Sequence, residues 1–306
     1  MTTTLVIGGS GFVSGAIVRM ALARGHKTFA LTRGNKAVAP GVVALRGDRS
    51  DAAAFRDALS AERAAPFFDL VIDCIGFNAR DAQQDVETFF PAARAPRAGH
   101  LVFLSSDFVL SPIERPAFVD ETFDRFDTAP YGAGKRAAEV VLMEAAAARK
   151  LPITVLRPCH IYGPGSLLGC LPLHGRDGQL LERLRRGEPL KLLGGGHFLQ
   201  QPIFVDDLAT MAFACPGLEA TRGQLFMAAG PEIIEARTFY RIIAELLGTS
   251  IAVEEASITE YLKGQPDHRA FCCHRLYKAD KARAAGFPMP SITMREGLAR
   301  HVQSLK

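Results

Sequence analysis

The feature that most constrains the fold is a glycine-rich turn near the N-terminus. Residues 4–7 form a short apolar run typical of a buried strand. The turn GGSG (8–11) follows at once, and residues 12–24 then carry apolar side chains at helical spacing. Residues 27–31 predict a second strand. A strand, a glycine turn, a helix and a strand of this length form a βαβ unit.

Such a turn suits a phosphate group. Gly8 and Gly11 let the backbone approach a pyrophosphate, and the helix start at Phe12 and Val13 offers free N–H groups and the positive end of a dipole. The spacing Gly8-x-x-Gly11-x-x-Ser14 between a strand and a helix predicts a dinucleotide cofactor. Ser14 replaces the usual third glycine, and because serine is small we expect only a slight adjustment.

The end of the second predicted strand indicates which dinucleotide binds. An NAD-binding chain normally carries a carboxylate there, whereas this chain has Thr32 followed by Arg33. A guanidinium pairs with a 2′-phosphate, so NADP is favoured over NAD; a plain surface arginine is the alternative. Asp48 either accepts a hydrogen bond from the adenine amino group or only forms a turn. Gly76, after the fourth strand, lies at the same cofactor edge.

Apolar runs alternate with helical patterns along the first half of the chain, which predicts a parallel sheet covered on both faces. The expected fold is α/β, a Rossmann-type doubly wound parallel sheet with a smaller C-terminal substrate domain. We assign 1–160 to the dinucleotide-binding domain, with part of 195–235 returning to it, and 161–306 mainly to the substrate domain. The further strands are expected at 42–45, 69–75, 100–104 and 152–156, and helices at 50–59, capped by Ser50, and 81–93.

Composition is that of an ordinary globular protein, 48% hydrophobic and 22% charged. A net charge of +4 gives little support to a nucleic-acid binder. None of the six cysteines falls in a CxxC motif, and Cys272-Cys273-His274 has no partner pair, so we expect no metal site. We find no signal peptide or membrane span and expect a cytoplasmic location.

Tyr131 and Lys135 lie one helical turn apart in the stretch APYGAGKRAAEVVLM (129–143). A cation beside a tyrosine favours its phenolate and lowers a pKa that is ordinarily near ~10. Such a pair moves a proton to or from a substrate hydroxyl. Ser106 follows the fifth predicted strand, at the sheet edge where ligands bind.

The motifs GGSGFVSG (8–15), LSSDFV (104–109) and YGAGK (131–135) occur in this order, and LRPCHIYGPG (156–165) and QQPIFVDDLA (200–209) follow them. Together they resemble the extended short-chain dehydrogenase/reductase superfamily, in its NAD-dependent epimerase/dehydratase branch. The resemblance covers nearly the whole chain. It implies a Rossmann-type cofactor domain, a helix of the substrate domain after VDDLA, and a homodimer packed through the helix that carries the tyrosine and its neighbour.

The resemblance also implies roles for three residues. Tyr131 would be the acid/base residue, Lys135 would hold the nicotinamide ribose, and Ser106 would hydrogen-bond the reacting oxygen. In the dehydratases of this branch an Asp-Glu pair follows the catalytic hydroxyl; here Asp107 is followed by Phe108, which argues against loss of water.

The expected substrate contacts come from three places in the chain. An Arg-Asp pair often precedes VDDLA and binds a diphosphate; Gln200-Gln201 replaces it here, which makes a nucleoside-diphosphate sugar less certain. The segment 163–178 is long enough for a binding loop and offers Ser166, His174, Arg176 and Asp177. We name Asp107, Ser166, His174, Arg176 and Gln200 as candidate substrate contacts, and expect the glycine turn at 194–196 to bring His197 near the site.

The predicted function is that of an NADP-dependent oxidoreductase or epimerase. It would act on a secondary hydroxyl or carbonyl of a small molecule, either sugar-like or a nucleoside or nucleotide sugar. The alternative is a non-catalytic NADP-binding protein, a redox sensor or an RNA-binding relative of the same fold. The intact Ser106, Tyr131 and Lys135 and the small net charge weigh against that alternative.

Overall fold

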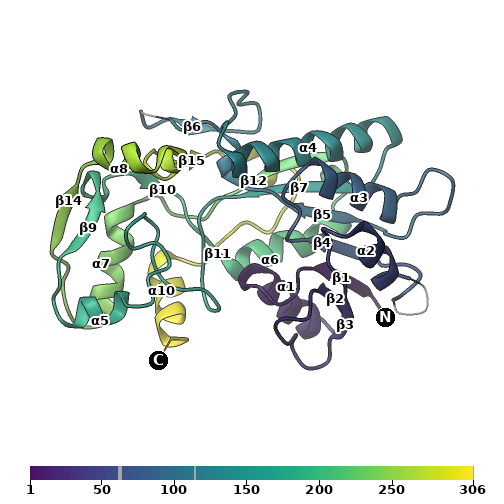
Figure 1. Cartoon of the computed structure of the whole chain (residues 1–306), viewed down its shortest axis with the longest axis horizontal. Coiled ribbons are helices and arrows are strands. Elements are labelled where there is room, and N and C mark those ends of the chain that lie inside the picture. Colours follow the sequence, from purple (N-terminus) through teal and green to yellow (C-terminus); the bar gives the residue numbers. More distant parts are fainter. Residues whose placement is uncertain (61–63, 114, 306) are drawn as a thin grey trace.

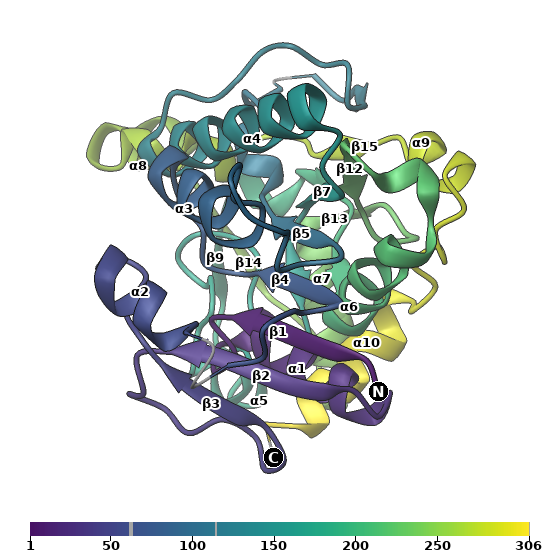
Figure 2. The same cartoon turned by 90° about the vertical axis from the view of Figure 1, so that its right-hand side faces the viewer.

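The computed structural model describes residues 1–60, 64–113 and 115–305, and Figures 1 and 2 show it from two perpendicular directions. Within these ranges the chain forms a seven-stranded parallel sheet with the order β12-β7-β5-β4-β1-β2-β3. Its strands, in chain order, are β1 (Thr3–Ile7), β2 (Lys27–Thr32), β3 (Val43–Arg46), β4 (Leu70–Asp73), β5 (Leu101–Leu104), β7 (Ile153–Pro158) and β12 (Gln224–Ala228). The predicted Rossmann-type, doubly wound parallel sheet is confirmed.

The chain winds outward from β1 in both directions, through β2 and β3 on one side and through β4, β5, β7 and β12 on the other. The strands β4, β5 and β7 are buried along their whole length, which explains why they are almost continuously apolar. In a sheet of this kind the crevice beside β1, where the strand order reverses, is the place where ligands bind.

Helices cover both faces of the sheet, as Figure 2 shows. The helices α1 (Phe12–Ala23) and α6 (Val205–Ala214) pack against one face, with Ile17, Ala21 and Leu208 in a shared core. The helices α2 (Ala52–Ala58), α3 (Ala79–Phe89) and α4 (Pro130–Arg149) cover the other, where a second core includes side chains from all three. Each core forms because the helices present an apolar stripe to a fully apolar sheet face.

Two sequence-based expectations about these helices are wrong. The cap of α2 is Asp51, whose side chain accepts hydrogen bonds from the backbone N–H of Ala53 and Ala54, and not Ser50. The hydroxyl of Ser50 donates to Asp48 instead. The helix after VDDLA, which the resemblance assigned to the substrate domain, is α6 and packs against α1 beneath the sheet.

The strand β12 lies within residues 195–235 and extends the sheet beyond β7. Its register pairs Gln224 with Thr154 and Ala228 with Pro158. A late segment therefore returns to the sheet, although the boundary between residues 160 and 161 remains a prediction.

A third hydrophobic core lies apart from the sheet, at the left of Figure 1. It joins Tyr162, Leu192, Phe239 and Leu298 from segments far apart in the chain. The helices of this C-terminal part are α5 (Leu180–Arg185), α7 (Ala236–Leu246), α8 (Ile258–Gly264), α9 (Asp280–Ala284) and α10 (Met294–Gln303). Of these, α9 packs on β12, not on the third core.

Short strands outside the large sheet pair in twos. They are β6 (Phe118–Val119) with β15 (Leu276–Tyr277), β8 (Ile161–Tyr162) with β11 (Ile203–Phe204), β9 (Leu190–Leu193) with β14 (Val253–Ala256), and β10 (Leu199–Gln200) with β13 (Ile234–Glu235). The 3₁₀ turns are Asp107–Val109, Gly194–Gly196, Cys215–Gly217, Glu219–Thr221 and Pro266–Phe271. No helix in the described part of the chain combines the length and apolar character that crossing a membrane requires.

Candidate active site

The glycine turn after β1 is tight enough to require glycine. Gly8 has φ +101°, and a Cβ atom there would lie 2.7 Å from Cγ2 of Ile75. Ser14, at the position of the usual third glycine, ties the turn together: its Oγ accepts a hydrogen bond from the N–H of Gly11 at 2.9 Å and donates to the carbonyl of Gly8. Serine in place of the usual third glycine therefore fits at this position and also adds two hydrogen bonds to the turn.

The start of α1 fits the pyrophosphate of a dinucleotide. Among the described residues, no hydrogen-bond partner satisfies the backbone N–H groups of Phe12 and Val13. They lie at the positive end of a 12-residue helix, directly after β1 at the reversal of strand order. Gly76, after β4, leaves no space for a Cβ because Asp73 and Phe103 fill it. The residues present therefore fit the predicted cofactor.

Two arginines, Arg33 and Arg46, lie near the end of β2, where the chain carries no carboxylate. Arg33 is exposed, and Thr32 is buried with its Oγ1 accepting from the N–H of Gly34 at 3.1 Å. Sequence reasoning missed Arg46, which pairs with Thr32 in the β2–β3 register. A Cβ on Gly34 would lie 3.2 Å from Nε of Arg46, so the Arg46 side chain lies against the turn that directly follows Arg33. The register of two strands, not the local sequence, brings Arg46 there.

Asp48 forms a turn. Its Oδ1 accepts hydrogen bonds from the backbone N–H of Ser50 at 2.9 Å and from the Ser50 hydroxyl at 2.7 Å. These bonds, with a smaller contribution from the charge of Arg33, lower the pKa of Asp48. Of the two roles predicted for Asp48, the structure shows the turn, and a contact with adenine stays a prediction.

The predicted catalytic hydroxyls meet at the carboxyl edge of the sheet. Ser106 follows β5, and its Oγ accepts from the N–H of Phe108 at 3.2 Å. Tyr131 is the second residue of α4, which begins at Pro130, a favoured first helical residue. Burial raises the pKa of Tyr131, while a hydrogen bond with Ser106 and the positive charge of Arg176 oppose that rise. The expectation that the pKa of Tyr131 is lowered is therefore wrong, because burial outweighs the neighbouring positive charge.

Lys135 lies on the buried side of α4 and is only 2% exposed. Its ammonium donates to the carbonyl oxygen of Leu104 at 2.6 Å and lies 4.9 Å from the ring centres of both Phe77 and Phe103. Burial lowers the pKa of Lys135 to about 8, although the negative charge of Asp73 opposes that change. The carbonyl of Leu104 is therefore the hydrogen-bond partner that the structure gives Lys135, and an effect of Lys135 on Tyr131 stays a prediction.

A buried cluster of charges lies beneath Lys135. The guanidinium of Arg49 pairs with Asp73 at 2.6 Å and with Asp85 at 2.8 Å, and its Nε lies 3.6 Å from Asp81. Burial raises the pKa of Asp85 well above its ordinary value, and the neighbouring charge of Asp73 adds to that rise. Burial would also raise the pKa of Asp73, but the charge of Arg49 holds it below its ordinary value. Removing one partner would leave a buried charge uncompensated.

A second buried ion pair fixes α4 against the sheet. Glu139 accepts from Arg157 of β7 at 2.8 and 2.6 Å and from the hydroxyl of Ser105 at 2.6 Å. Closer to the site, Gly134 allows α4 to approach the carbonyl of Phe77, which a Cβ would meet at 2.5 Å. These contacts set the position of the first turn of α4, and hence of Tyr131, relative to β5.

Aromatic rings flank the Tyr131 phenol, a feature that the sequence pattern did not predict. The ring centres of Phe77 and Phe108 lie 6.4 and 6.2 Å from that of Tyr131. Phe271 then packs edge-on against Phe108 at 4.8 Å. Phe77 is 49% exposed and Tyr131 47%, so the surface around the phenol is partly apolar.

Two predicted substrate contacts lie inside the protein. Asp107 is 2% exposed; its Oδ2 accepts from the hydroxyl of Tyr277 at 2.8 Å and pairs with Arg275 at 3.2 Å. It therefore supports the site from below and does not face a substrate. Gln200 is also buried, with no hydrogen-bond partner for its Oε1 among the described residues. Gln201 bridges Gly230 and the backbone of Tyr277.

The segment 163–178 is a well-anchored loop. His174, expected to meet substrate, is buried: its Nδ1 bonds Asp177 at 3.0 Å and its Nε2 accepts from the N–H of Lys191 at 3.2 Å. The hydroxyl of Ser166 donates to Leu167. The expectation for His174 is wrong, because it holds the loop in place; Ser166 remains a prediction.

Arg176, in the same loop, is exposed, and its role as a substrate contact stays a prediction. Its positive charge opposes the rise in the pKa of Tyr131, and burial, with a smaller contribution from that charge, lowers the pKa of His160 to about 4. His160 follows β7 and packs against Phe239 at 5.9 Å. Sequence reasoning missed His160, although it lies between the motif residues Arg157 and Tyr162.

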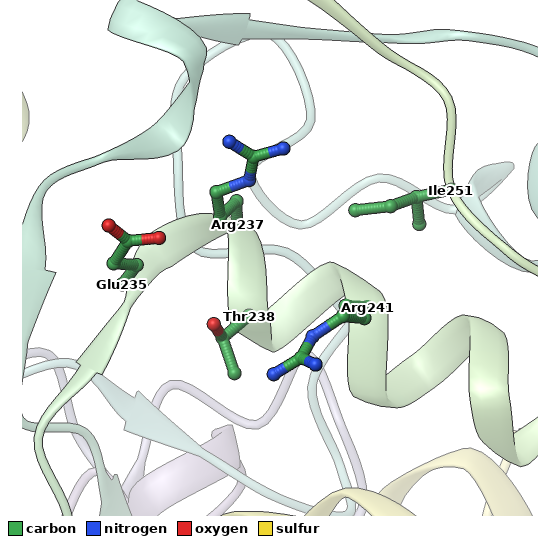
Figure 3. Close-up of a pocket in the computed structure, with 5 residues that line it drawn as sticks. All are labelled: Glu235, Arg237, Thr238, Arg241 and Ile251. Atoms are coloured by element: carbon green, nitrogen blue, oxygen red, sulfur yellow. The ribbon is translucent and has the colours of Figure 1, made fainter.

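The expected position of His197 near the site stays a prediction. His197 bonds Glu235 at 3.2 Å and Arg237 at 3.0 Å. A pocket of about 410 Å³ is lined by Glu235, Arg237, Thr238, Arg241 and Ile251, and Figure 3 shows these five side chains. None of these is a predicted site residue. In the described ranges, no group of three or more His, Cys, Asp and Glu side chains is arranged to hold a metal ion.

The fold and site define a dinucleotide-binding α/β protein with a Ser-Tyr-Lys constellation. Residues 4–216 match the model of the NAD dependent epimerase/dehydratase family, and the chain belongs to that family, within the extended short-chain dehydrogenases/reductases. It is an NAD(P)-dependent enzyme of this type.

Two curated relatives and one solved structure show the range of the family. The chain is 28% identical to 2-alkyl-3-oxoalkanoate reductase of Stenotrophomonas maltophilia, over 97% of both chains. It is 27% identical to chloroplast stem-loop binding protein of 41 kDa b of Arabidopsis thaliana, over 75% of this chain and 59% of that protein. dTDP-glucose 4,6-dehydratase from Bacillus anthracis, solved in complex with NAD, has the same fold, with a TM-score of 0.78, 18% identity, and coverage of 99% and 96%.

Proposed function

We propose that this protein is an NADP-dependent oxidoreductase that interconverts a secondary alcohol and its ketone. The observation that carries the proposal is the packing of the turn that carries Ser106 against the first turn of α4, which carries Tyr131, at the sheet edge that the glycine turn also borders. When bound, the nicotinamide cofactor supplies or accepts the hydride.

In this proposal Tyr131 gives a proton to the substrate oxygen during reduction and takes it back during oxidation, while Ser106 hydrogen-bonds the same oxygen. The raised pKa of Tyr131 suits the direction of reduction, because the phenol carries its proton at neutral pH. Lys135, whose ammonium now lies against Phe77 and the carbonyl of Leu104, would hold the ribose. Phe12, Val13 and Gly76 would border the pyrophosphate and the nicotinamide.

NADP is favoured over NAD by charge. Arg33 and Arg46 flank the turn at Gly34, where a 2′-phosphate would lie. Two guanidinium groups attract a phosphate, but they cannot accept the hydrogen bond that a 2′-hydroxyl donates to the carboxylate of an NAD site.

A reductase is better supported than an epimerase. The relative that matches nearly the whole chain is named as a reductase of 2-alkyl-3-oxoalkanoates, and apolar rings flank Tyr131 here. The earlier expectation of a sugar-like substrate or a nucleotide sugar remains the second candidate, since a solved structure of the same fold is a dTDP-glucose dehydratase.

The test compares Tyr131→Phe and Ser106→Ala with Tyr162→Phe, which removes a hydroxyl that contacts Thr293 of the C-terminal part. We expect the first two variants to lose at least about 100-fold in kcat with NADPH and a ketone substrate. All three should bind NADPH as the parent does in a fluorescence titration. Full turnover by Tyr131→Phe would overturn the proposal and favour a non-catalytic NADP-binding protein, such as a sensor or an RNA-binding relative.

A further inference from the structure

A row of aromatic rings begins at Tyr131 and leads into the C-terminal part of the chain. The centre of the Phe108 ring lies 6.2 Å from that of Tyr131, and the Phe271 ring lies 4.8 Å from that of Phe108. His268 follows at 5.3 Å from Phe271, and Tyr261 at 5.8 Å from His268. These five residues form the aromatic row. Its outer end lies on α8, which is well separated from α1 in both views (Figures 1 and 2).

The aromatic row keeps part of its surface exposed. Tyr131 is 47% exposed, and the other four rings are half-buried. Rings that only fill a core are closed to solvent, as Phe103 and Phe239 are in this protein. An exposed apolar surface on a soluble protein marks a place where another molecule binds. Because this surface begins at the proposed acid/base residue, the molecule that it suits is the substrate of that residue.

The inner end of the aromatic row is fixed before any ligand binds. The Phe108 ring meets the rings of Tyr131 and Phe271 edge-on, at 85° and 83°. The guanidinium of Arg275 lies 4.3 Å from the centre of the Phe108 ring, and it is itself buried and paired with Asp107 at 3.2 Å. Phe108 is thus held by three neighbours, so a ligand meets a preformed surface and the cost of ordering that surface on binding is small.

The chemistry of the aromatic row suits an alkyl chain better than a nucleotide sugar. Sugar hydroxyls and a diphosphate need hydrogen-bond partners and cations, which phenylalanine rings do not provide. The hydroxyl of Tyr261 and Nδ1 of His268 already bond each other at 2.6 Å, and Asp107 already pairs with the charge of Arg275. Rings that meet edge-on also form no flat platform for a nucleobase, whereas a flexible methylene chain follows them.

We propose that the aromatic row binds the alkyl chain of a long-chain ketone. The carbonyl group lies at Tyr131, and the chain runs over Phe108 and Phe271 toward His268. This inference rests on the proposed function for the identity of the site, and it names the substrate class. Each methylene group that leaves water for the row strengthens binding, so affinity rises with chain length until the chain has passed the row.

The first test compares kcat/KM with NADPH for 2-nonanone and for 2-butanone, which has five fewer methylene groups. We expect a ratio of at least about 50 in the parent, because each buried methylene contributes about threefold to fourfold. Phe271→Ala should lower this ratio about 10-fold, and Phe271→Leu should keep most of it. The control is Phe67→Ala, which changes an exposed phenylalanine that precedes β4 at the other edge of the sheet and should leave the ratio unchanged.

A binding measurement separates this inference from the proposed function. Protein saturated with NADPH is titrated calorimetrically with octanamide and with butanamide, whose amide carbonyl is not reduced by the cofactor. We expect octanamide to bind at least about 20-fold more tightly in the parent and less than about fivefold more tightly in Phe271→Ala. Such binding without turnover of either ketone would refute the oxidoreductase and support the alkyl site. Turnover of both ketones with equal kcat/KM would support the oxidoreductase and overturn the alkyl site.

Two further outcomes would also overturn the inference. A chain-length preference that survives in both Phe271→Ala and His268→Ala would place the chain elsewhere. UDP-glucose that binds in a manner dependent on Phe271, with no binding of octanamide, would assign the aromatic row to a nucleotide sugar. His268→Ala removes the next ring along the row and repeats the measurement if Phe271→Ala does not fold.

Discussion

The ammonium group of Lys135 lies 4.9 Å from the centre of the Phe77 ring. Phe103 and the carbonyl of Leu104 complete the enclosure. The residue predicted to hold the nicotinamide ribose is therefore buried, and Phe77 forms one wall around its ammonium group.

This cover predicts a pH dependence of cofactor affinity. Burial lowers the pKa of Lys135 to about 8, so its positive charge is present below that pH and is lost above it. We expect NADPH to bind about 10-fold more weakly at pH 9 than at pH 7. In Phe77→Ala the lysine is more exposed, its pKa moves toward its ordinary value, and the loss should begin at least about one pH unit higher. Fluorescence titration of NADPH across this pH range measures the affinity of the parent and of Phe77→Ala. Phe118→Ala, which changes an exposed phenylalanine, serves as control.

The arginines at the end of β2 and β3 predict cofactor preference. In Arg33→Gln, NADPH should bind about 10-fold more weakly and NADH unchanged, because only NADPH carries the 2′-phosphate. In the double variant Arg33→Gln with Arg46→Gln, the affinities for NADPH and NADH should lie within about threefold of each other. Kd values for both cofactors check this, with Arg24→Gln, whose side chain packs over Phe213, as control. An unchanged preference in the double variant would contradict an NADP site at this turn.

The Ser14 hydroxyl predicts a specific loss of stability. Ser14→Ala removes both bonds to the glycine turn and should lower the free energy of unfolding by about 1–3 kcal/mol. Cofactor affinity should fall as well, since the turn that holds Phe12 and Val13 loosens. Urea unfolding and NADPH titration measure the two effects, and Ser10→Ala, in the same turn, serves as control. Equal behaviour of the two variants would show that the Ser14 bonds contribute nothing.

His100 predicts sensitivity to acid. Its Nε2 bonds Thr154 at 2.8 Å, its Nδ1 has no partner among the described residues, and burial lowers its pKa from 6.5 to about 4. Because the folded-state pKa is depressed, the stability linked to His100 is complete above about pH 6.5 and is lost as the pH falls toward 4. The full loss is up to roughly 3 kcal/mol. His100→Gln should flatten the pH dependence of urea unfolding in that window, whereas exposed His197→Gln should leave it unchanged.

The close approach of α4 to the loop after β4 predicts that Gly134→Ala is severely damaging. Its Cβ would meet the Phe77 carbonyl at 2.5 Å, so the helix must shift and carry Tyr131 with it. We expect at least about a 100-fold fall in kcat/KM. Gly264→Ala adds a methyl group with no atom within 4 Å and should keep full activity. Steady-state kinetics and circular dichroism separate a displaced Tyr131 from a failure to fold.

Much of the fold and part of the site are encoded by local sequence. The run of residues 4–31 specifies a strand, a turn and a helix, because glycine conformation and apolar periodicity act over a few neighbouring residues. The spacing of Tyr131 and Lys135 likewise places both in the first turns of one helix, and the motif order identifies the family. These features need no knowledge of distant contacts.

Only the tertiary structure decided what the side chains do. Asp107 looked available for substrate until Arg275 and Tyr277, from the far end of the chain, enclosed it. His174 became a support of its loop, Lys135 was covered by Phe77, and Arg46 came beside Thr32 through strand register. The physical reason is that burial and charge pairing depend on residues that meet in space, so a charged group's availability is determined by partners that its own sequence neighbourhood does not contain.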